Sequence, residues 1–395
     1  MNEQLIVKNF GPIKDATVDF KRVTVFIGPT GGGKSTLAKL AATVKQGDMI
    51  DFGTSDAGGS LSKLGIESYM IEKESFIDWK LSNGLSFCID NTKEPIENND
   101  LEIHTVLEED YESNKEQYKA EMNIELNNYL LSPKGKALPT SLVENIKFNF
   151  DNAIKRMIRE SMIKTLFPST PHYIPAERIL LSSIGQSWSG IIRDDIGLPK
   201  LLVEFANSFS TARKSIKNVK IPFLSVRYSH EDNQDLIEST ELNKVFNLHE
   251  TASGVQSVTP LLVLIEYLSS DTEQTQSFII EEPELNLYPT AQQGLLNWLV
   301  EKCTKGENDL TITTHSPYLL AHFNTLLFAY QVAQNHPERA DEIAKIVPRE
   351  SWLDPKEFAA YHVEGQKENG VRSIINPETG LISYNGLDAI ASAEA

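Results

Sequence analysis

The stretch Gly28-Pro29-Thr30-Gly31-Gly32-Gly33-Lys34-Ser35-Thr36 decides the fold. It matches a phosphate-binding pattern in which a glycine and four free positions precede Gly-Lys-Ser. The apolar, β-branched run VTVFI at 23–27 predicts a buried strand of a parallel sheet in front of it. Leu37, Leu40 and Ala41 behind it share one face of a predicted helix. Strand, glycine loop and helix therefore follow one another in the order that a triphosphate site needs.

Each part of this loop has a chemical reason. The consecutive glycines let the backbone adopt positive φ and bring N–H groups against phosphate oxygens, and the positive end of the helix dipole points at the same place. Lysine is expected to reach the β- and γ-phosphates, and serine to offer a hydroxyl to Mg²⁺. A chance glycine-rich turn is the alternative, and the flanking strand and helix argue against it. The predicted nucleotide-binding residues are Gly28, Thr30, Gly31, Gly32, Gly33, Lys34, Ser35 and Thr36.

Composition is that of an ordinary globular protein. The 395 residues are 40% hydrophobic and 23% charged, enough for one large domain or several smaller ones. The formal net charge of −18 argues against a surface that binds nucleic acid or an anionic membrane all over, although it leaves room for a local basic groove.

Cysteine usage and apolar runs bear on the compartment. Cys88 and Cys303 have no spacing for zinc or for a disulfide framework. The polar N-terminus lacks the apolar core of a signal peptide. The longest apolar run, at 258–268, contains Pro260 and Glu266 and is too short to span a bilayer. We expect a cytoplasmic protein without a membrane partner.

The rest of the chain gives a coarse organisation. Residues 4–8 and 16–20 predict two strands around a turn at 9–12, which would form an antiparallel flap before the loop. Phe10 in this turn could stack on a base, but packing within the turn is favoured. Further along, the patterns predict a loop at 47–61, a strand at 85–89, a solvated acidic stretch at 94–119 and a long helix at 142–162.

Acidic side chains follow a second buried strand. The apolar residues 277–280 run into Glu281-Glu282-Pro283-Glu284, at the carboxyl end where α/β sheets place their ligands. Glu281 suits a Mg²⁺ ligand and Glu282 suits the base that deprotonates an attacking water. Another strand, 311–314, ends at His315, which can hydrogen-bond a γ-phosphate.

Two further segments are candidates for anion contacts. Ser253-Gly254-Val255-Gln256 precedes an apolar helical run at 261–265, so it is either a plain helix cap or a phosphate site at a helix start. The stretch 211–220 is the most basic in the chain. A solvated loop is favoured there, and the alternative is a DNA or RNA contact by Arg213, Lys214 and Lys217.

These motifs, in this order, resemble those of ABC-type ATPase heads. They are most similar to the SMC/RecF/OLD branch, with which Asn9-Phe10-Gly11-Pro12-Ile13 and the segment 173–178 also agree. The resemblance covers the two ends of the chain well and about 60–240 poorly. It implies an α/β P-loop NTPase fold with a mixed sheet core, an antiparallel flap and a helical lobe with an insertion. The single domain would divide into a nucleotide lobe (1–55 and 270–395) and a helical, signature-bearing lobe (56–269).

The resemblance also implies how the site is completed. Two heads would pair head to tail around ATP, with Ser253, Gly254 and Gln256 of one copy acting on the phosphate loop of the other. Glu282 would be the catalytic base and His315 the switch histidine, while Ser35 and Glu281 would hold Mg²⁺. Most such heads have Asp at the position of Glu281, and no glutamine is assigned to Mg²⁺ here.

The implied function is ATP hydrolysis coupled to a separate effector. The tail after His315 contains no Asp-x-Asp nuclease motif and no Arg-x4–6-His ribonuclease motif. This layout resembles the ATPases of anti-phage pairs such as Septu and PARIS, which have a nuclease or toxin partner. The alternatives are a RecF-like DNA-repair ATPase and a nucleotide-dependent scaffold with incidental hydrolysis; a transporter subunit fits least. The implied partners are a homodimer or higher homo-oligomer, an effector, and DNA or RNA.

Overall fold

The computed structural model describes residues 3–46, 75–81, 86–90, 169–184, 198–270 and 274–383. The loop expected at 47–61, the acidic stretch at 94–119 and the long helix at 142–162 lie outside the described residues. The described strands form three sheets.

A six-stranded mixed sheet in the order β14-β13-β3-β12-β11-β6 carries the phosphate-binding loop. Its strands are β3 (Val23–Ile27), β6 (Ser169–Ile174), β11 (Thr275–Glu281), β12 (Asp309–Thr314), β13 (Phe358–Val363) and β14 (Val371–Ser373). β3 pairs in parallel with β12 on one side and with β13 on the other. The strands predicted before the loop, before the glutamates and before His315 are confirmed, and their carboxyl ends meet at one edge of the sheet.

The two faces of this sheet have separate apolar cores. Val25 and Ile27 lie in the core on one side, whereas Phe26 between them lies in the core on the other side with α1 (Lys34–Lys45). The helices that contribute to the first core include α8 (Ser253–Ser269), α9 (Pro289–Cys303) and α10 (Pro317–Asn335). Every residue of β3 is buried, because a central parallel strand is covered on both faces.

An antiparallel flap covers the α1 side of the molecule. Its sheet has the order β2-β1-β4-β5, with β1 (Glu3–Phe10), β2 (Ile13–Phe20), β4 (Phe76–Lys80) and β5 (Ser86–Asp90). Val7 pairs with Ala16 across β1 and β2, and the rings of Phe20 and Trp79 stack at 4.9 Å. Phe10 is buried in the core beneath the turn, as the favoured interpretation required. The predicted flap is confirmed.

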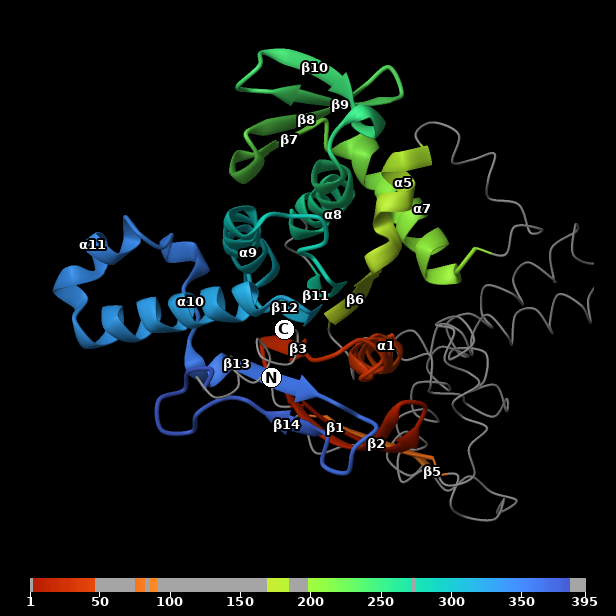
Figure 1. The fold of residues 1–395 in the computed structure, drawn as a ribbon, viewed down its shortest axis with the longest axis vertical. Helices are drawn as coiled ribbons and strands as arrows, with labels where there is room; N and C mark the ends of the chain where they lie inside the picture. Colours follow the sequence, from red (N-terminus) through yellow and green to blue (C-terminus); the bar gives the residue numbers. More distant parts are fainter. Residues whose placement is uncertain are drawn as a thin grey trace, which may run out of the picture.

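The opposite end of the molecule carries an antiparallel sheet that the sequence analysis did not predict. Its order is β10-β9-β8-β7, and Figure 1 shows it at the far end from the flap. The strands are β7 (Asn218–Ile221), β8 (Val226–Glu231), β9 (Gln234–Ser239) and β10 (Lys244–Asn247), and helices α5 (Ile179–Ile184) and α7 (Lys200–Ser215) lie beside α8 below them.

The prediction that the basic stretch 211–220 is a solvated loop is wrong. The stretch forms the last turn of α7 and most of β7. Exposed basic residues alternate here with buried apolar ones, since Ala212, Val219 and Ile221 lie in the core. The basic side chains therefore dominate the composition of a segment that is partly buried.

The remaining elements are short. Helix α11 (Ala340–Ala344) follows α10, and 3-10 turns span Ala176–Arg178, Pro222–Leu224, Leu248–Glu250, Pro337–Arg339, Arg349–Ser351 and Pro355–Glu357.

Cys303 is buried as a free thiol, and burial raises its pKa well above the usual range. Within the described ranges, none of the helices has both the length and the apolar character to cross a bilayer. Strands β4, β5 and β6 come from the 56–269 stretch yet pair in the sheets next to the phosphate loop.

Candidate active site

The phosphate-binding loop joins β3 to α1 and depends on glycine at several positions. Gly31 and Gly33 have φ of 76° and 101°, a region that L side chains rarely adopt. Gly28 and Gly32 approach β13 instead: a Cβ at either position would stand 2.3 or 2.4 Å from the Val363 carbonyl oxygen. The loop therefore needs glycine both for its turn and for its contact with the end of β13.

Lys34 points back into its own loop. Its Nζ donates to the carbonyl oxygens of Gly28 at 2.8 Å and Pro29 at 3.0 Å. Thr36 is buried in the first turn of α1, whereas Thr30 and Ser35 are exposed. The structure thus places the predicted lysine and hydroxyl groups around one loop, where the ammonium could exchange carbonyl oxygens for phosphate oxygens.

Glu281 ends β11 with a carboxylate that is buried and incompletely satisfied. Its side chain has only 6% of its surface exposed, and Oε1 has no hydrogen-bond partner among the described residues. Burial and the Glu281 charge together raise the pKa of the neighbouring Tyr173 well above its usual range. An orphaned carboxylate oxygen at the carboxyl end of a strand fits a hard cation such as Mg²⁺.

Glu282 is held in an unusual backbone conformation. Its φ is 42°, which is uncommon for a residue other than glycine and costs about 1 kcal/mol or more. Its N–H donates to the Thr313 carbonyl of β12 at 2.8 Å. The strand geometry of β11 therefore ends at Glu281, and the backbone turns at Glu282.

Glu282 and His315 form a direct pair. His315 Nε2 lies 3.3 Å from Glu282 Oε1, and both side chains are about three-tenths exposed. This hydrogen bond is the main reason that the pKa of Glu282 is lowered, and the charges of Lys34 and Arg178 lower it further. The carboxylate is therefore the form present at neutral pH, as a general base must be.

The sequence predicts no role for Glu284, whereas in the structure this residue holds the end of β12. This buried carboxylate accepts hydrogen bonds from the Thr314 hydroxyl at 2.5 Å and from the His315 backbone N–H at 3.0 Å. Ser316 next to them donates to Gln292 Oε1 of α9 at 2.6 Å. The turn after β11 thus fixes the backbone that carries His315.

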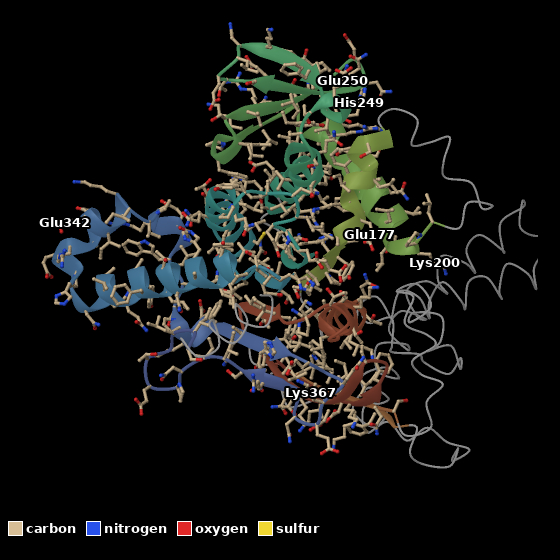
Figure 2. All side chains as sticks on the ribbon, viewed as in Figure 1. Glu177, Lys200, His249, Glu250, Glu342 and Lys367 are labelled. Carbon is tan, nitrogen blue, oxygen red and sulfur yellow. The ribbon has the colours of Figure 1, made fainter. Side chains whose placement is uncertain are left out.

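Arg178 is the second residue whose role was missed. Its guanidinium is fully buried and donates to backbone carbonyls on several elements, including Glu281 and Glu282 at 2.7 Å each. In the sequence, Arg178 ends the segment 173–178, and nothing in that segment identifies backbone carbonyls as its partners. Figure 2 labels Glu177, the residue before it, beside α5.

The signature segment begins α8. Ser253 is exposed at the first turn, and Gly254 is buried against the loop after β11, since a Cβ there would stand 2.7 Å from the Asn286 carbonyl oxygen. The Gln256 amide donates within its own chain to the carbonyls of His249 at 3.0 Å and Thr251 at 2.7 Å. His249 is labelled in Figure 2 near the far sheet. Gln256 therefore braces the turn that leads into α8.

The basic residues lie apart from this site, at the end of α7. Lys214 and Lys217 are exposed. Arg213 donates to Asp235 at 2.8 Å, and the same carboxylate also accepts from Tyr228 and His230. Part of the Arg213 charge is thus already paired inside the protein.

The arrangement fits a Mg²⁺–triphosphate ligand. The glycine cradle and Lys34 would hold phosphates, and Ser35 and Glu281 would supply oxygen ligands to the ion. Among the described residues, no group of three or more His, Cys, Asp or Glu side chains is placed to hold a metal.

Comparisons with known proteins give the following similarities. A family model described as "AAA domain, putative AbiEii toxin, Type IV TA system" matches residues 171–321. A solved Smc head domain with an extended coiled coil, bound to the C-terminal domain of ScpA and derived from Pyrococcus furiosus, is 11% identical with a TM-score of 0.36 over 99% of each chain.

A second solved structure, the SMC head domain from Thermotoga maritima, is 10% identical with a TM-score of 0.35, over 82% of this chain and 92% of that one. No curated protein matches the chain. The parallel strands β13, β3, β12, β11 and β6, with a glycine loop between β3 and α1, give this chain an α/β fold of the P-loop NTPase type.

Proposed function

We propose that this protein is an ATPase of the ABC-head type that binds and hydrolyses ATP with Mg²⁺. The observation that carries the proposal is the Glu282–His315 pair at 3.3 Å, whose carboxylate also feels the charge of Lys34 in the phosphate-binding loop. Three separate parts of the chain would then supply a base (Glu282), a γ-phosphate contact (His315) and a phosphate cradle (28–34) at one edge of the sheet.

The chain's own residues suggest the steps of hydrolysis. Lys34 would leave the carbonyls of its loop and bind the β- and γ-phosphates. Glu282 would accept a proton from the attacking water, and His315 would hydrogen-bond the γ-phosphate. Mg²⁺, held by Ser35 and Glu281, would neutralise charge on the phosphates. Glu284 would keep the His315 backbone in place during these steps.

A second copy of the chain would complete the site. In this proposal Ser253 and Gly254 face the phosphates bound by a partner subunit, in a head-to-tail dimer. The exposure of Ser253 at the start of α8 supports it. Gln256 would contribute by holding the preceding turn through its carbonyl contacts. The nucleotide lobe would be 1–55 and 270–395 together with β4, β5 and β6, and the remainder of 56–269 would form the signature lobe.

The dimer would control a separate effector, a nuclease or toxin, in anti-phage defence in the cytoplasm. The support is the layout of motifs and the description of the matching family, which names a toxin and a type IV TA system. A RecF-like repair ATPase and a scaffold with incidental hydrolysis are the competing proposals. An adjacent nuclease or toxin gene would favour defence, whereas adjacent replication genes would favour repair.

Replacing the base tests the enzymatic proposal. Glu282→Gln should lower ATP turnover by about 10²–10⁴-fold and accumulate an ATP-bound dimer, measured by phosphate release and by light scattering after size exclusion. Glu301→Gln, on the exposed face of α9, is the matched control and should behave as wild type. Wild-type turnover by Glu282→Gln would refute the catalytic assignment. A wild-type protein that dimerises with ATP but does not hydrolyse it would favour the scaffold.

Nucleic-acid binding is tested separately at the end of α7. Reversing the charge of Lys214 and Lys217, which are exposed, should weaken DNA or RNA binding and flatten its salt dependence. Arg213→Glu should add an effect on stability, because its partner Asp235 would lose an ion pair. Unchanged binding by the lysine variants would exclude this surface.

A further inference from the structure

One buried arginine links the catalytic edge of the sheet to the signature helix. Arg178 Nε donates to the Ser257 carbonyl of α8 at 3.1 Å. Its Nη1 donates to Pro175 at 3.1 Å and to Glu281 at 2.7 Å, and its Nη2 donates to Glu282 at 2.7 Å. A planar guanidinium has five donors in a rigid fork, so four fixed carbonyls on three segments determine its position completely.

The charge of this arginine is compensated inside the protein. Arg178 has no exposed surface, and burial lowers its pKa to about 10. The carboxylates of Glu284, Glu282, Glu281 and Glu177 act in the opposite direction. The side chain therefore remains a cation at neutral pH, surrounded by the same glutamates that form the catalytic turn. A buried charge that touches this turn has a role that a buried apolar side chain could not fill.

The bond to Glu282 falls on a strained residue. A positive φ outside glycine persists when the surroundings over-determine it. At Glu282 the N–H is held by Thr313 of β12, and the carbonyl is held by Arg178 and by the Leu285 N–H at 3.2 Å. Hydrogen bonds thus fix both the N–H and the carbonyl of Glu282, and Arg178 is the charged partner.

The bond to Ser257 falls one turn after Gly254. Gly254 itself packs on Asn286 in the loop that follows Glu282. The start of α8 therefore touches the catalytic turn twice, once by close packing and once through the Arg178 guanidinium. A shift of α8 relative to β11 would have to stretch either the bond to Ser257 or the bonds to Glu281 and Glu282.

We infer that Arg178 is a positioning residue that sets the Glu282 base and couples it to the position of the signature helix. Docking of a second copy on Ser253 and Gly254 would then be felt at Glu282 through Arg178. This inference rests on the proposed ATPase function, and it adds a residue that touches neither nucleotide nor partner.

The test compares two arginine-to-lysine changes. Arg178→Lys keeps the charge, but a single ammonium cannot reach carbonyls on three segments. We expect kcat for ATP to fall by about tenfold or more while KM stays within about twofold. Arg22→Lys is the matched control, because Arg22 also donates to backbone carbonyls, those of Thr304 and Gly306, but at the amino end of β3. It should leave both constants unchanged.

A second readout does not require hydrolysis. Amide hydrogen exchange should accelerate at 282–287 and 257–261 in Arg178→Lys and not in Arg22→Lys. A double variant completes the test: in a Glu282→Gln background, Arg178→Lys should lower single-turnover hydrolysis no further, because it acts through the base that is already removed.

The outcomes separate the inference from the proposed function. A wild-type protein without ATP hydrolysis refutes the proposed function, and the exchange measurement then still decides whether Arg178 holds the turn and α8 together. Wild-type kcat in Arg178→Lys, unchanged exchange at 282–287, or equal losses with and without Glu282 would each overturn the role of Arg178.

Discussion

Gly32 offers a sharp test of how the phosphate-binding loop is built. Its Cβ would stand 2.4 Å from the Val363 carbonyl oxygen and 3.0 Å from that of Pro29, and both are backbone atoms. Van der Waals contact begins at about 3.4 Å, so Gly32→Ala must displace the loop from β13 by about 1 Å. The Gly365 N–H, which donates to the Gly32 carbonyl at 2.8 Å, would lose its partner as well.

The cost in affinity follows from that displacement. A shift of about 1 Å lengthens an N–H···O contact with phosphate from about 2.9 to about 3.9 Å, beyond hydrogen-bond range. Charge-assisted bonds contribute about 1.5–3 kcal/mol each, so the loss of two weakens ATP binding by about 10²–10⁴-fold. We expect this loss in a calorimetric titration with ATP and Mg²⁺.

The neighbouring glycine provides the control. Gly31 has φ of 76°, but nothing lies within 4 Å of its Cβ position. Gly31→Ala should cost about 1–2 kcal/mol of stability from backbone strain in the free and the bound protein alike, and change affinity by less than about threefold. Equal losses in both variants, or near wild-type affinity in Gly32→Ala, would show that contact with β13 does not shape the loop.

Three other changes have defined outcomes. His315→Ala removes the hydrogen bond that lowers the pKa of Glu282, so the acidic limb of the kcat–pH profile should move to higher pH; an unmoved limb would separate the two residues. Because a depressed carboxylate pKa keeps the base form at lower pH, activity is lost earlier as the pH falls in the variant. Glu284→Ala should lower the free energy of unfolding by about 2–4 kcal/mol in urea, since it strands two buried donors, and a loss below 1 kcal/mol would contradict this. Lys45→Met should cost about 3–5 kcal/mol, because it leaves the buried Asp309 carboxylate, 2.8 Å from Lys45 Nζ, without its cation; a neutral change would show that this ion pair does not stabilise the fold.

The strongest local patterns predicted the central part of the fold. The runs 23–27 and 275–281 contain the apolar segments VTVFI and FII, and each stops at a glycine loop or at glutamates. The flap followed from alternation around a turn at Gly11 and Pro12. Sequence period and turn chemistry suffice when a segment is buried in a regular way.

The sheet formed by β7 to β10 was not predicted because its strands bury few apolar side chains. Tyr228 on β8 and Ile237 on β9 are the buried hydrophobic residues of that hairpin, and most of the other residues of the two strands are polar or charged. A turn signal was present, since Asp232 and Asn233 have φ of 47° and 63°, as a two-residue hairpin requires. Without apolar alternation on both sides, it did not mark a hairpin.

The hydrogen bonds of Arg178 and Glu284 could not be predicted from the sequence for another reason. Arg178 bonds to backbone carbonyls, and Glu284 bonds partly to the His315 backbone N–H. Every residue offers a carbonyl, and every residue except proline offers an N–H, so such bonds carry no signature of residue type. They become visible when strands far apart in the chain are placed side by side.

The phosphate-binding loop also depends on that long-range placement. β3 sits between β12 and β13, and the turn after β13 bonds to the loop at Gly32 and to the flap at Lys14. A change that loosens β13 would therefore lower ATP affinity without touching a residue that contacts the nucleotide. If the loop binds ATP as proposed, linkage requires that bound ATP stabilise the pairing of β13 with β3 by the same free energy. We therefore expect nucleotide affinity to depend on the closure of the central sheet as well as on the loop.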